Sequence, residues 1–152
     1  MHSDNIHFDT IPARWLTGVW VALEDVDESN GPLTVFPGSH KLPTTTFQDL
    51  DLPPANRDNL KKVYTEYEKG IEKVIASNNL QPKEIIIKKG MAIIWSANTL
   101  HGGKAIKDEN RTRKSQVIHY HYEGCTKYFN PLYSEPHLGK YKERFLKDIQ
   151  II

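Results

Sequence analysis

Short runs of apolar residues, separated by turn residues, dominate this chain and predict β-strands. Residues 16–23 (LTGVWVAL) mix β-branched, aromatic and aliphatic side chains, which is typical of a strand buried on one or both faces. Shorter runs of the same kind predict strands over 33–36, 84–88 and 91–95. Residues 115–122 alternate strictly, so one face of that predicted strand carries Val117, His119 and His121, and the other Gln116, Ile118, Tyr120 and Tyr122.

Turn and helix signals fill the intervals between these strands. Turns are predicted at 29–32, which contains the pair Asn30-Gly31, and at 37–40, whereas the proline-containing stretch 42–58 predicts a long surface loop. Apolar residues at helical spacing predict one helix over residues 59–76, and a second, C-terminal helix over residues 140–149. Together the elements predict a mainly β fold, a double-sheet jelly roll with an inserted helix and a C-terminal helix.

Composition and charge narrow the function without fixing it. A length of 152 residues predicts a single domain over 1–152. A formal net charge of +1 gives no reason to expect a nucleic-acid partner. No apolar run reaches membrane-spanning length and no signal peptide opens the chain, so we expect no membrane partner and a cytoplasmic location. The single cysteine, Cys125, has no partner within the chain for a disulfide, which fits a reducing compartment.

A metal-ligand pattern spans the two ends of the predicted core. The chain reads His2-Ser3-Asp4 at its start and Leu100-His101-Gly102 far downstream. Residues i and i+2 of an extended segment point to the same side, so His2 and Asp4 can reach one ion together. Two histidines and one carboxylate form the facial triad that holds non-haem Fe(II) and leaves coordination positions open. His-x-Asp alone is a weak signal, because so short a motif recurs by chance.

Two arginines follow His101 at the start of the next predicted strand. Arg111 and Arg113 each carry a guanidinium fork that binds a carboxylate through two hydrogen bonds and stays charged at any working pH. An arginine at this place is what a site for a dicarboxylate co-substrate needs.

With these residues in view, the chain closely resembles the phytanoyl-CoA dioxygenase family of Fe(II)- and 2-oxoglutarate-dependent oxygenases. The resemblance runs from residue 2 to about residue 125, and its motifs occur in the family's order. The matching stretches are HSDNIHF, GVWVALEDVDESNGPLTVFPGSHKLP, KKGMAIIWSANTLHGG and RTRKSQVIHYHYEGC.

The resemblance implies a double-stranded β-helix and a role for each matching residue. It makes His2, Asp4 and His101 the iron ligands, and the same three the catalytic centre. It makes Arg113 the partner of the distal 2-oxoglutarate carboxylate, with Arg111 as the alternative, and it places Trp20 against the co-substrate. Relatives often carry a serine two residues after the distal histidine, where this chain has Gly103. The loop and helix over 42–76 would be the insertion that often shapes the substrate pocket.

The implied activity is hydroxylation of a small organic substrate by O2, with 2-oxoglutarate converted to succinate and CO2. Asp4 favours hydroxylation, because relatives that halogenate lack the carboxylate ligand. Two alternatives stay open: a cupin-like metal-binding protein that is not an oxygenase, and a catalytically silent domain that retains the ligands. No motif selects a primary substrate.

Each of these residues also has an ordinary structural interpretation. His2 could belong to a solvated tail, Asp4 to a turn, His101 to a loop, Arg113 to a solvated face and Trp20 to the core. One site accounts for all five together, whereas the ordinary roles need five independent explanations. A further alternative concerns His119 and His121, which could form a second metal pair but more simply line or border the pocket on one face of the last strand.

The family resemblance also predicts what this chain lacks. Family members carry a substantial segment before His-x-Asp, including a first barrel strand, and here only Met1 precedes His2. A missing strand exposes unpaired backbone groups on its neighbour. We therefore expect either a homodimer that covers this edge or weakly held metal with little turnover.

Overall fold

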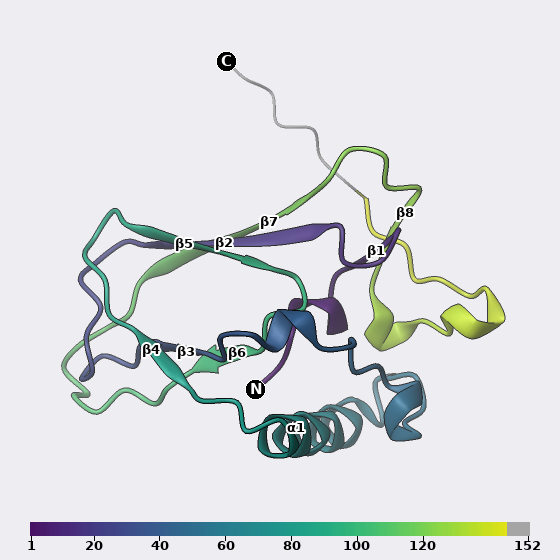
Figure 1. Ribbon diagram of the computed structural model, residues 1–152, viewed down its shortest axis with the longest axis horizontal. Helices are drawn as coiled ribbons and strands as arrows, with labels where there is room; N and C mark the ends of the chain where they lie inside the picture. The colour runs from purple at the N-terminus through teal and green to yellow at the C-terminus, as the bar shows by residue number, and fades with distance from the viewer. Residues whose placement is uncertain (146–152) are drawn as a thin grey trace.

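Two antiparallel sheets of three strands form the body of the molecule. The computed structural model describes residues 1–145. The first sheet places β2 (Leu16–Ala22) between β5 (Ala92–Ser96) and β7 (Ser115–His121). The second places β3 (Leu33–Val35) between β4 (Lys83–Ile85) and β6 (His101–Gly103). Figure 1 shows the two sheets as facing layers, with the helix α1 (Leu60–Ser77) on the far side of the second sheet from the first.

A smaller ribbon closes one end of these layers. It pairs β1 (Asp9–Ile11) with β8 (Lys127–Phe129). Short 3-10 turns complete the described chain: η1 (Asp4–Ile6), η2 (Ser39–Lys41), η3 (Gln48–Leu50), η4 (Pro131–Tyr133) and η5 (Pro136–Leu138). None of the helices among residues 1–145 is long and apolar enough to cross a membrane.

The long predicted elements are confirmed, with boundaries that move by one to three residues. The predictions of strands over 16–23, 33–36, 84–88, 91–95 and 115–122 correspond to β2, β3, β4, β5 and β7, and the helix over 59–76 is α1. The alternation along β7 is also confirmed, because Val117, His119 and His121 are register partners of the inward positions of β2. Strands β1, β6 and β8 were not predicted, since none of them lies in an apolar run like those of the predicted strands.

The predicted C-terminal helix over 140–149 is wrong in its described part. Backbone hydrogen bonds join Asn130 to Lys142 (2.9 Å) and Arg144 to Tyr128 (2.8 Å), so this segment runs alongside β8. The Tyr141 ring packs edge-on against Phe129, with 4.9 Å between ring centroids. These tertiary contacts override the helical spacing of the apolar residues. Residues 146–149 of the predicted helix lie outside the described residues.

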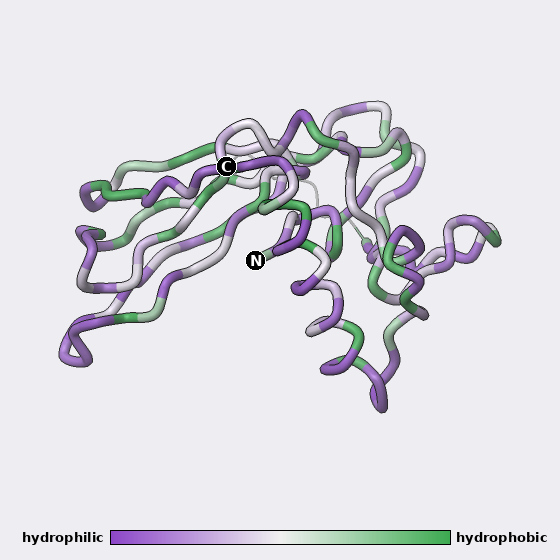
Figure 2. The backbone as a smooth tube through the Cα atoms, turned by 60° about the horizontal axis from the view of Figure 1, so that its bottom comes forward, coloured by the Kyte–Doolittle hydropathy of each residue, from purple (hydrophilic) through white to green (hydrophobic). Residues whose placement is uncertain are grey.

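Apolar side chains gather in two clusters, and the N-terminal segment runs between them. One cluster lies between the sheets and contains Trp20, Ala22, Val26, Leu33 and Trp95. The other joins α1 to the N-terminal segment and contains Ile6, Phe36, Phe47, Ala55, Val63, Tyr67, Ile71, Leu100 and Leu132. Figure 2 shows hydrophobic and hydrophilic residues alternating along the strands, as expected for layers that bury one face. Buried residues Ser3, Asp4 and Asn5 therefore enter the protein interior between the clusters.

Candidate metal centre

The structure brings His2, Asp4 and His101 together as the sequence predicts. His2 and His101 form an antiparallel bridge, with N–H···O distances of 3.0 and 2.9 Å in the two directions. One ligand atom from each of the three residues lies within 4.8 Å of the other two. Asp4 differs from the expectation in one detail, because it begins the 3-10 turn η1 and does not continue the strand. Figure 1 shows the N-terminal segment passing beside β6 and turning towards the first sheet.

His101 is held in the tautomer that a metal ligand needs. The ring is buried, and its Nδ1 lies 2.9 Å from the carbonyl oxygen of Thr99. A carbonyl only accepts hydrogen bonds, so Nδ1 carries a proton and Nε2 is the nitrogen that would bind a metal. That Nε2 lies 3.5 Å from Oδ1 of Asp4. Nε2 of His101 therefore faces the other candidate ligands.

Asp4 is a buried carboxylate with its two oxygens in different surroundings. Oδ2 accepts a hydrogen bond of 2.6 Å from Nε1 of Trp95 and lies 3.2 Å from Nε2 of His119. Burial acts to raise the pKa of Asp4, but the interactions with His119, His101 and Trp95 outweigh it and hold that pKa below its ordinary value. Asp4 therefore stays anionic, with Oδ1 directed towards His101.

His2 completes the set as a neutral imidazole. Burial, followed by the proximity of His101, lowers the pKa of His2 to about 4. The rings of His2 and His101 have centroids 4.7 Å apart. Two imidazoles and one carboxylate, with ligand atoms close enough to share one ion, fit the donor set of a non-haem Fe(II) centre.

The lowered pKa of His2 predicts how the metal-free chain responds to acid. The unfolded chain binds a proton at His2 near the ordinary histidine pKa of 6.5, whereas the native chain does so only near 4. The unfolded state thus binds more protons within this window, and the stability of the native state falls as the pH drops from 6.5 to 4. Urea unfolding of the chelated parent and of His2→Gln at several pH values checks this. We expect the free energy of unfolding to fall more steeply with decreasing pH in the parent than in His2→Gln. If it falls equally in both proteins, the pKa of His2 is not lowered.

The two arginines are placed differently. The guanidinium of Arg111 is hydrogen-bonded to Asp27 and Ser29, each at 2.6 Å. Hydrogen bonds from Ser29 and from Arg111 hold the pKa of Asp27 well below its usual range. Arg113 lies two residues before β7 and donates from Nη1 to the carbonyl of Gly31 at 2.7 Å. No carboxylate among residues 1–145 forms an ion pair with Arg113. Its remaining donors are therefore free for a ligand.

Gly103 shows that Arg113 lies on the same side of β6 as His101. Residues two apart in a strand point to one face, and a Cβ built on Gly103 would lie 3.0 Å from Nη1 of Arg113. The glycine, where relatives often carry serine, therefore makes room for the guanidinium beside the ligand strand. Arg113, to which the resemblance assigns the co-substrate carboxylate, thus lies on the same side of β6 as His101, and its role stays a prediction.

Trp20 lies on the inward face of β2, one inward position away from Gly18. It is 2% exposed and packs with Trp95, Ala22, Val26 and Leu33. This packing accounts for the residue as part of the core, and its contact with a co-substrate stays a prediction.

Within residues 1–145, the two histidines of β7 have no third ligand with which they could form a second metal site. His121 stacks against Tyr128, with 5.8 Å between centroids. Among the described residues, neither His119 nor His121 belongs to a group of three potential ligands. His119 instead lies beside the Asp4 carboxylate.

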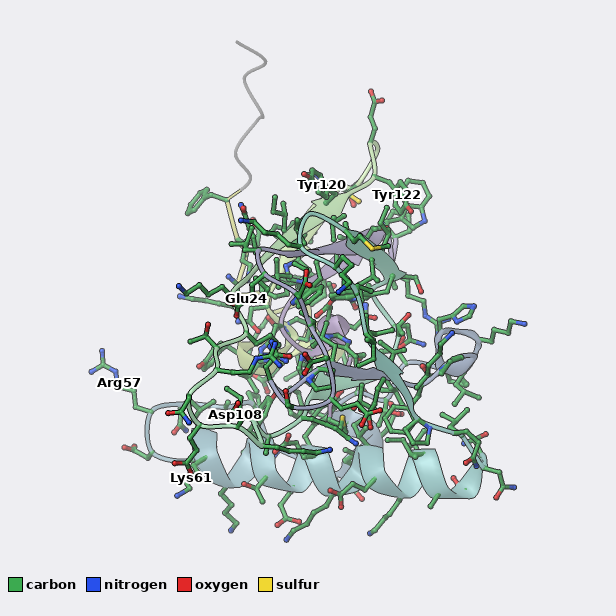
Figure 3. All side chains as sticks on the ribbon, turned by 90° about the vertical axis from the view of Figure 1, so that its left-hand side faces the viewer. Glu24, Arg57, Lys61, Asp108, Tyr120 and Tyr122 are labelled. Atoms are coloured by element: carbon green, nitrogen blue, oxygen red, sulfur yellow. The ribbon has the colours of Figure 1, made fainter. Side chains whose placement is uncertain are left out.

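His7 is a site residue that sequence reasoning missed. Its ring lies edge-on to His2, with 5.8 Å between centroids, and stacks with Tyr64 at 5.6 Å. His7 and Tyr64 line a cavity of about 700 Å³ beside the metal centre. The lining also includes three cations, Arg57, Lys61 and Arg144, and no acidic residue of the described chain. Figure 3 shows Arg57 and Lys61 near one end of α1, with the Arg57 side chain extended away from the protein.

Comparison with known proteins gives a family match over most of the chain. The model of the family described as phytanoyl-CoA dioxygenase (PhyH) matches residues 1–115. The rat protein named peroxisomal phytanoyl-CoA dioxygenase is 28% identical over 133 residues, which is 82% of this chain and 34% of that protein. A probable phytanoyl-CoA dioxygenase of Caenorhabditis elegans is 26% identical over 137 residues, 86% of this chain and 38% of that protein. The chain thus spans little more than a third of the length of these relatives.

Solved structures share the fold. The non-haem α-ketoglutarate-dependent epimerase SnoN from nogalamycin biosynthesis aligns with a TM-score of 0.53 and 22% identity, over 85% of this chain and 41% of its own. The carbocyclase SnoK from the same biosynthesis aligns with a TM-score of 0.51 and 17% identity, over 96% of this chain and 52% of its own. The predicted jelly-roll fold is thereby confirmed.

Proposed function

The chain belongs to the phytanoyl-CoA dioxygenase family, and from this membership and its metal centre we propose that it is a Fe(II)- and 2-oxoglutarate-dependent dioxygenase that hydroxylates a small organic substrate. The observation that carries the proposal is the convergence of His2, Asp4 and His101 within 4.8 Å. The free guanidinium donors of Arg113 on the same side of β6 as His101 support it.

Each residue has a distinct task in this proposal. His2, Asp4 and His101 would hold Fe(II), which when bound supplies O2 activation coupled to conversion of 2-oxoglutarate to succinate and CO2. The tautomer of His101 and the lowered pKa values of His2 and Asp4 keep all three ready to bind a cation near neutral pH. Arg113 would bind the distal carboxylate of 2-oxoglutarate through its fork. Trp20 would support the co-substrate from the inner face of β2.

The cavity beside His7 would admit the primary substrate to the centre. Its apolar and aromatic lining suits an organic molecule, and the cations at Arg57, Lys61 and Arg144 suit an anionic group on that molecule. The name of the rat relative gives an acyl-CoA as its substrate. For this chain, the cavity lining supports only the broader proposal that the substrate is a small molecule with a negatively charged group.

Succinate formation tests the proposal directly. The purified chain with Fe(II), ascorbate and 2-oxoglutarate should form succinate slowly without substrate, and His101→Ala should form none. Proton NMR of the mixture measures succinate, and thermal melts report binding. A melting temperature that rises with metal but not further with 2-oxoglutarate, together with no succinate formation, would favour a cupin-like metal protein. A melt insensitive to both would indicate a silent domain.

A further inference from the structure

One row of the first sheet places three residues around the Asp4 carboxylate. Gly18 on β2 is the register partner of Trp95 on β5 and also of His119 on β7. These strands are adjacent, so the three residues form a line across the sheet. Outward neighbours of His119 point the opposite way: Tyr120 and Tyr122 lie on the side of the molecule opposite α1 in Figure 3. The inward side of the row faces Asp4.

The middle of this row has to be glycine because the Trp95 indole and the Asp4 carboxylate together occupy the space above it. A Cβ built on Gly18 would lie 2.9 Å from Oδ2 of Asp4 and 2.6 Å from Nε1 of Trp95. Real Cβ atoms essentially never approach other heavy atoms so closely. Glycine is found inside strands at places where another group approaches the backbone closely, as the side chains of Trp95 and Asp4 do here. Oδ2 thus rests on the backbone of β2.

The two flanking residues present nitrogen atoms to that same oxygen. Nε1 of Trp95 donates to Oδ2 at 2.6 Å, and Nε2 of His119 lies 3.2 Å from Oδ2. Nε2 of His119 is buried and has no hydrogen-bond partner within residues 1–145. A buried polar group without a hydrogen-bond partner destabilises the fold, so its retention beside a candidate ligand calls for an explanation. A small rotation of the ring would align Nε2–H with Oδ2, which already lies 3.2 Å away, and would supply the missing hydrogen bond.

The His119 ring is fixed from its other side. It stacks on Phe8 with 4.3 Å between centroids, and the guanidinium of Arg144 lies 4.6 Å from the centre of the Phe8 ring. Phe8 follows η1, whose first residue is Asp4, and the backbone N–H of Phe8 bonds the carbonyl of Asp4 at 2.8 Å. The same turn therefore positions both the carboxylate and the ring that supports His119.

We propose that Trp95, Gly18 and His119 form a cradle that holds Oδ2 of Asp4 and presents Oδ1 alone to the metal. All three are positioning residues, since they touch a ligand and act through it. A carboxylate held by one oxygen uses one metal position, which leaves more positions open for a co-substrate and O2. The inference rests on the proposed metal centre, and its first test needs no metal.

The first experiment uses the chelated, metal-free chain. A charge-assisted hydrogen bond should shift the Trp95 indole proton downfield in the NMR spectrum. The shift should be lost in Asp4→Leu and altered in His119→Phe, which keeps the stacked ring on Phe8 and removes the N–H. His121→Phe is the matched control, two residues along the same face, and should leave the signal in place. An indole signal unchanged in His119→Phe would overturn the role of His119.

The second experiment measures Co(II) affinity and the visible spectrum of the Co(II) protein. Loss of a hydrogen-bond partner of a metal ligand typically lowers metal affinity about 10- to 100-fold. We expect that loss in Trp95→Phe, His119→Phe and Gly18→Ala, with a changed spectrum at saturation, while His121→Phe stays within about twofold of the parent. Parent-like affinity and spectra in these variants would overturn the cradle. A parent that binds no Co(II) and forms no succinate, yet shows the indole shift, would refute the proposed function and support the cradle as a structural device.

Discussion

Alanine at any one of His2, Asp4 and His101 is expected to abolish stabilisation by metal. A ligand that binds only the native state raises its stability by about 2.7 kcal/mol at one hundred times the dissociation constant. The ligand atoms of the three residues lie within 4.8 Å of one another, so removal of one leaves an incomplete set. Anaerobic thermal melts of the parent with Fe(II), with and without 2-oxoglutarate, should show an increase that each variant lacks.

Controls separate this result from general damage to the fold. His121→Ala removes an imidazole from the inward face of β7 that stacks on Tyr128, and its metal response should match that of the parent. The metal-free melts serve as the baseline for each variant. Asp4→Ala also leaves the Trp95 indole without its acceptor, so its baseline should fall further than that of His2→Ala. If all three variants respond to metal as the parent does, the triad assignment is wrong.

The meeting of His2, Asp4 and His101 in space could be predicted because two of the three are near neighbours in the sequence. His2 and Asp4 are two residues apart, and His101 stands in a recognisable stretch that ends in two glycines. The backbone bridge between His2 and His101 then brings these two residues together, whereas Asp4 is also held by the distant side chain of Trp95. Strand β2 and helix α1 were predictable for a related reason, since each is long enough to display its period.

The support around the ligands could not be predicted, because it depends on strand register. Gly18 meets Trp95 and His119 only after three strands from distant parts of the sequence have paired. A one-residue slip in either pairing would turn Trp95 or His119 to the outer face. Likewise, no pattern in the sequence marks His7 as a neighbour of His2, because the contact arises from the turn at Asp4–Ile6.

The C-terminal segment shows the opposite failure, in which a clear pattern was overridden. Apolar residues at helical spacing begin at Tyr141, yet this residue packs on Phe129 and its neighbours bond to the backbone beside β8. Helical propensity contributes only tenths of a kcal/mol per residue, so a few tertiary hydrogen bonds and one aromatic contact decide the outcome. Arg111 and Arg113 have the same chemistry, and only their tertiary contacts distinguish them: Arg111 is bonded to Asp27, whereas Arg113 lies beside Gly103.

Leucine at Arg113 is expected to weaken 2-oxoglutarate binding by about 2–4 kcal/mol, the range for removing one partner of a desolvated, hydrogen-bonded charge pair. The guanidinium lies beside Gly103 on the same side of β6 as His101, where it would bind the co-substrate carboxylate. Metal affinity should barely change, because the guanidinium of Arg113 donates to the carbonyl of Gly31 and not to a ligand residue. Calorimetric titration of 2-oxoglutarate into the Mn(II)-loaded, anaerobic protein measures the effect, and Arg113→Lys should recover only part of it, since an ammonium cannot reproduce the fork.

Arg111→Leu is the matched control, because it removes the same group two residues earlier. Its guanidinium is already bonded to Asp27 and Ser29, and the side chains of the Arg111–Asp27 ion pair are partly exposed to solvent, at 34% and 45%. A solvent-exposed pair of this kind contributes little to stability, so the variant should fold, unfold slightly earlier and bind 2-oxoglutarate as the parent does. A larger loss of 2-oxoglutarate affinity in Arg111→Leu than in Arg113→Leu would reverse the two assignments. In that case Arg111 would have to leave Asp27 to reach the co-substrate, and Asp27→Asn, by freeing it, should then strengthen 2-oxoglutarate binding.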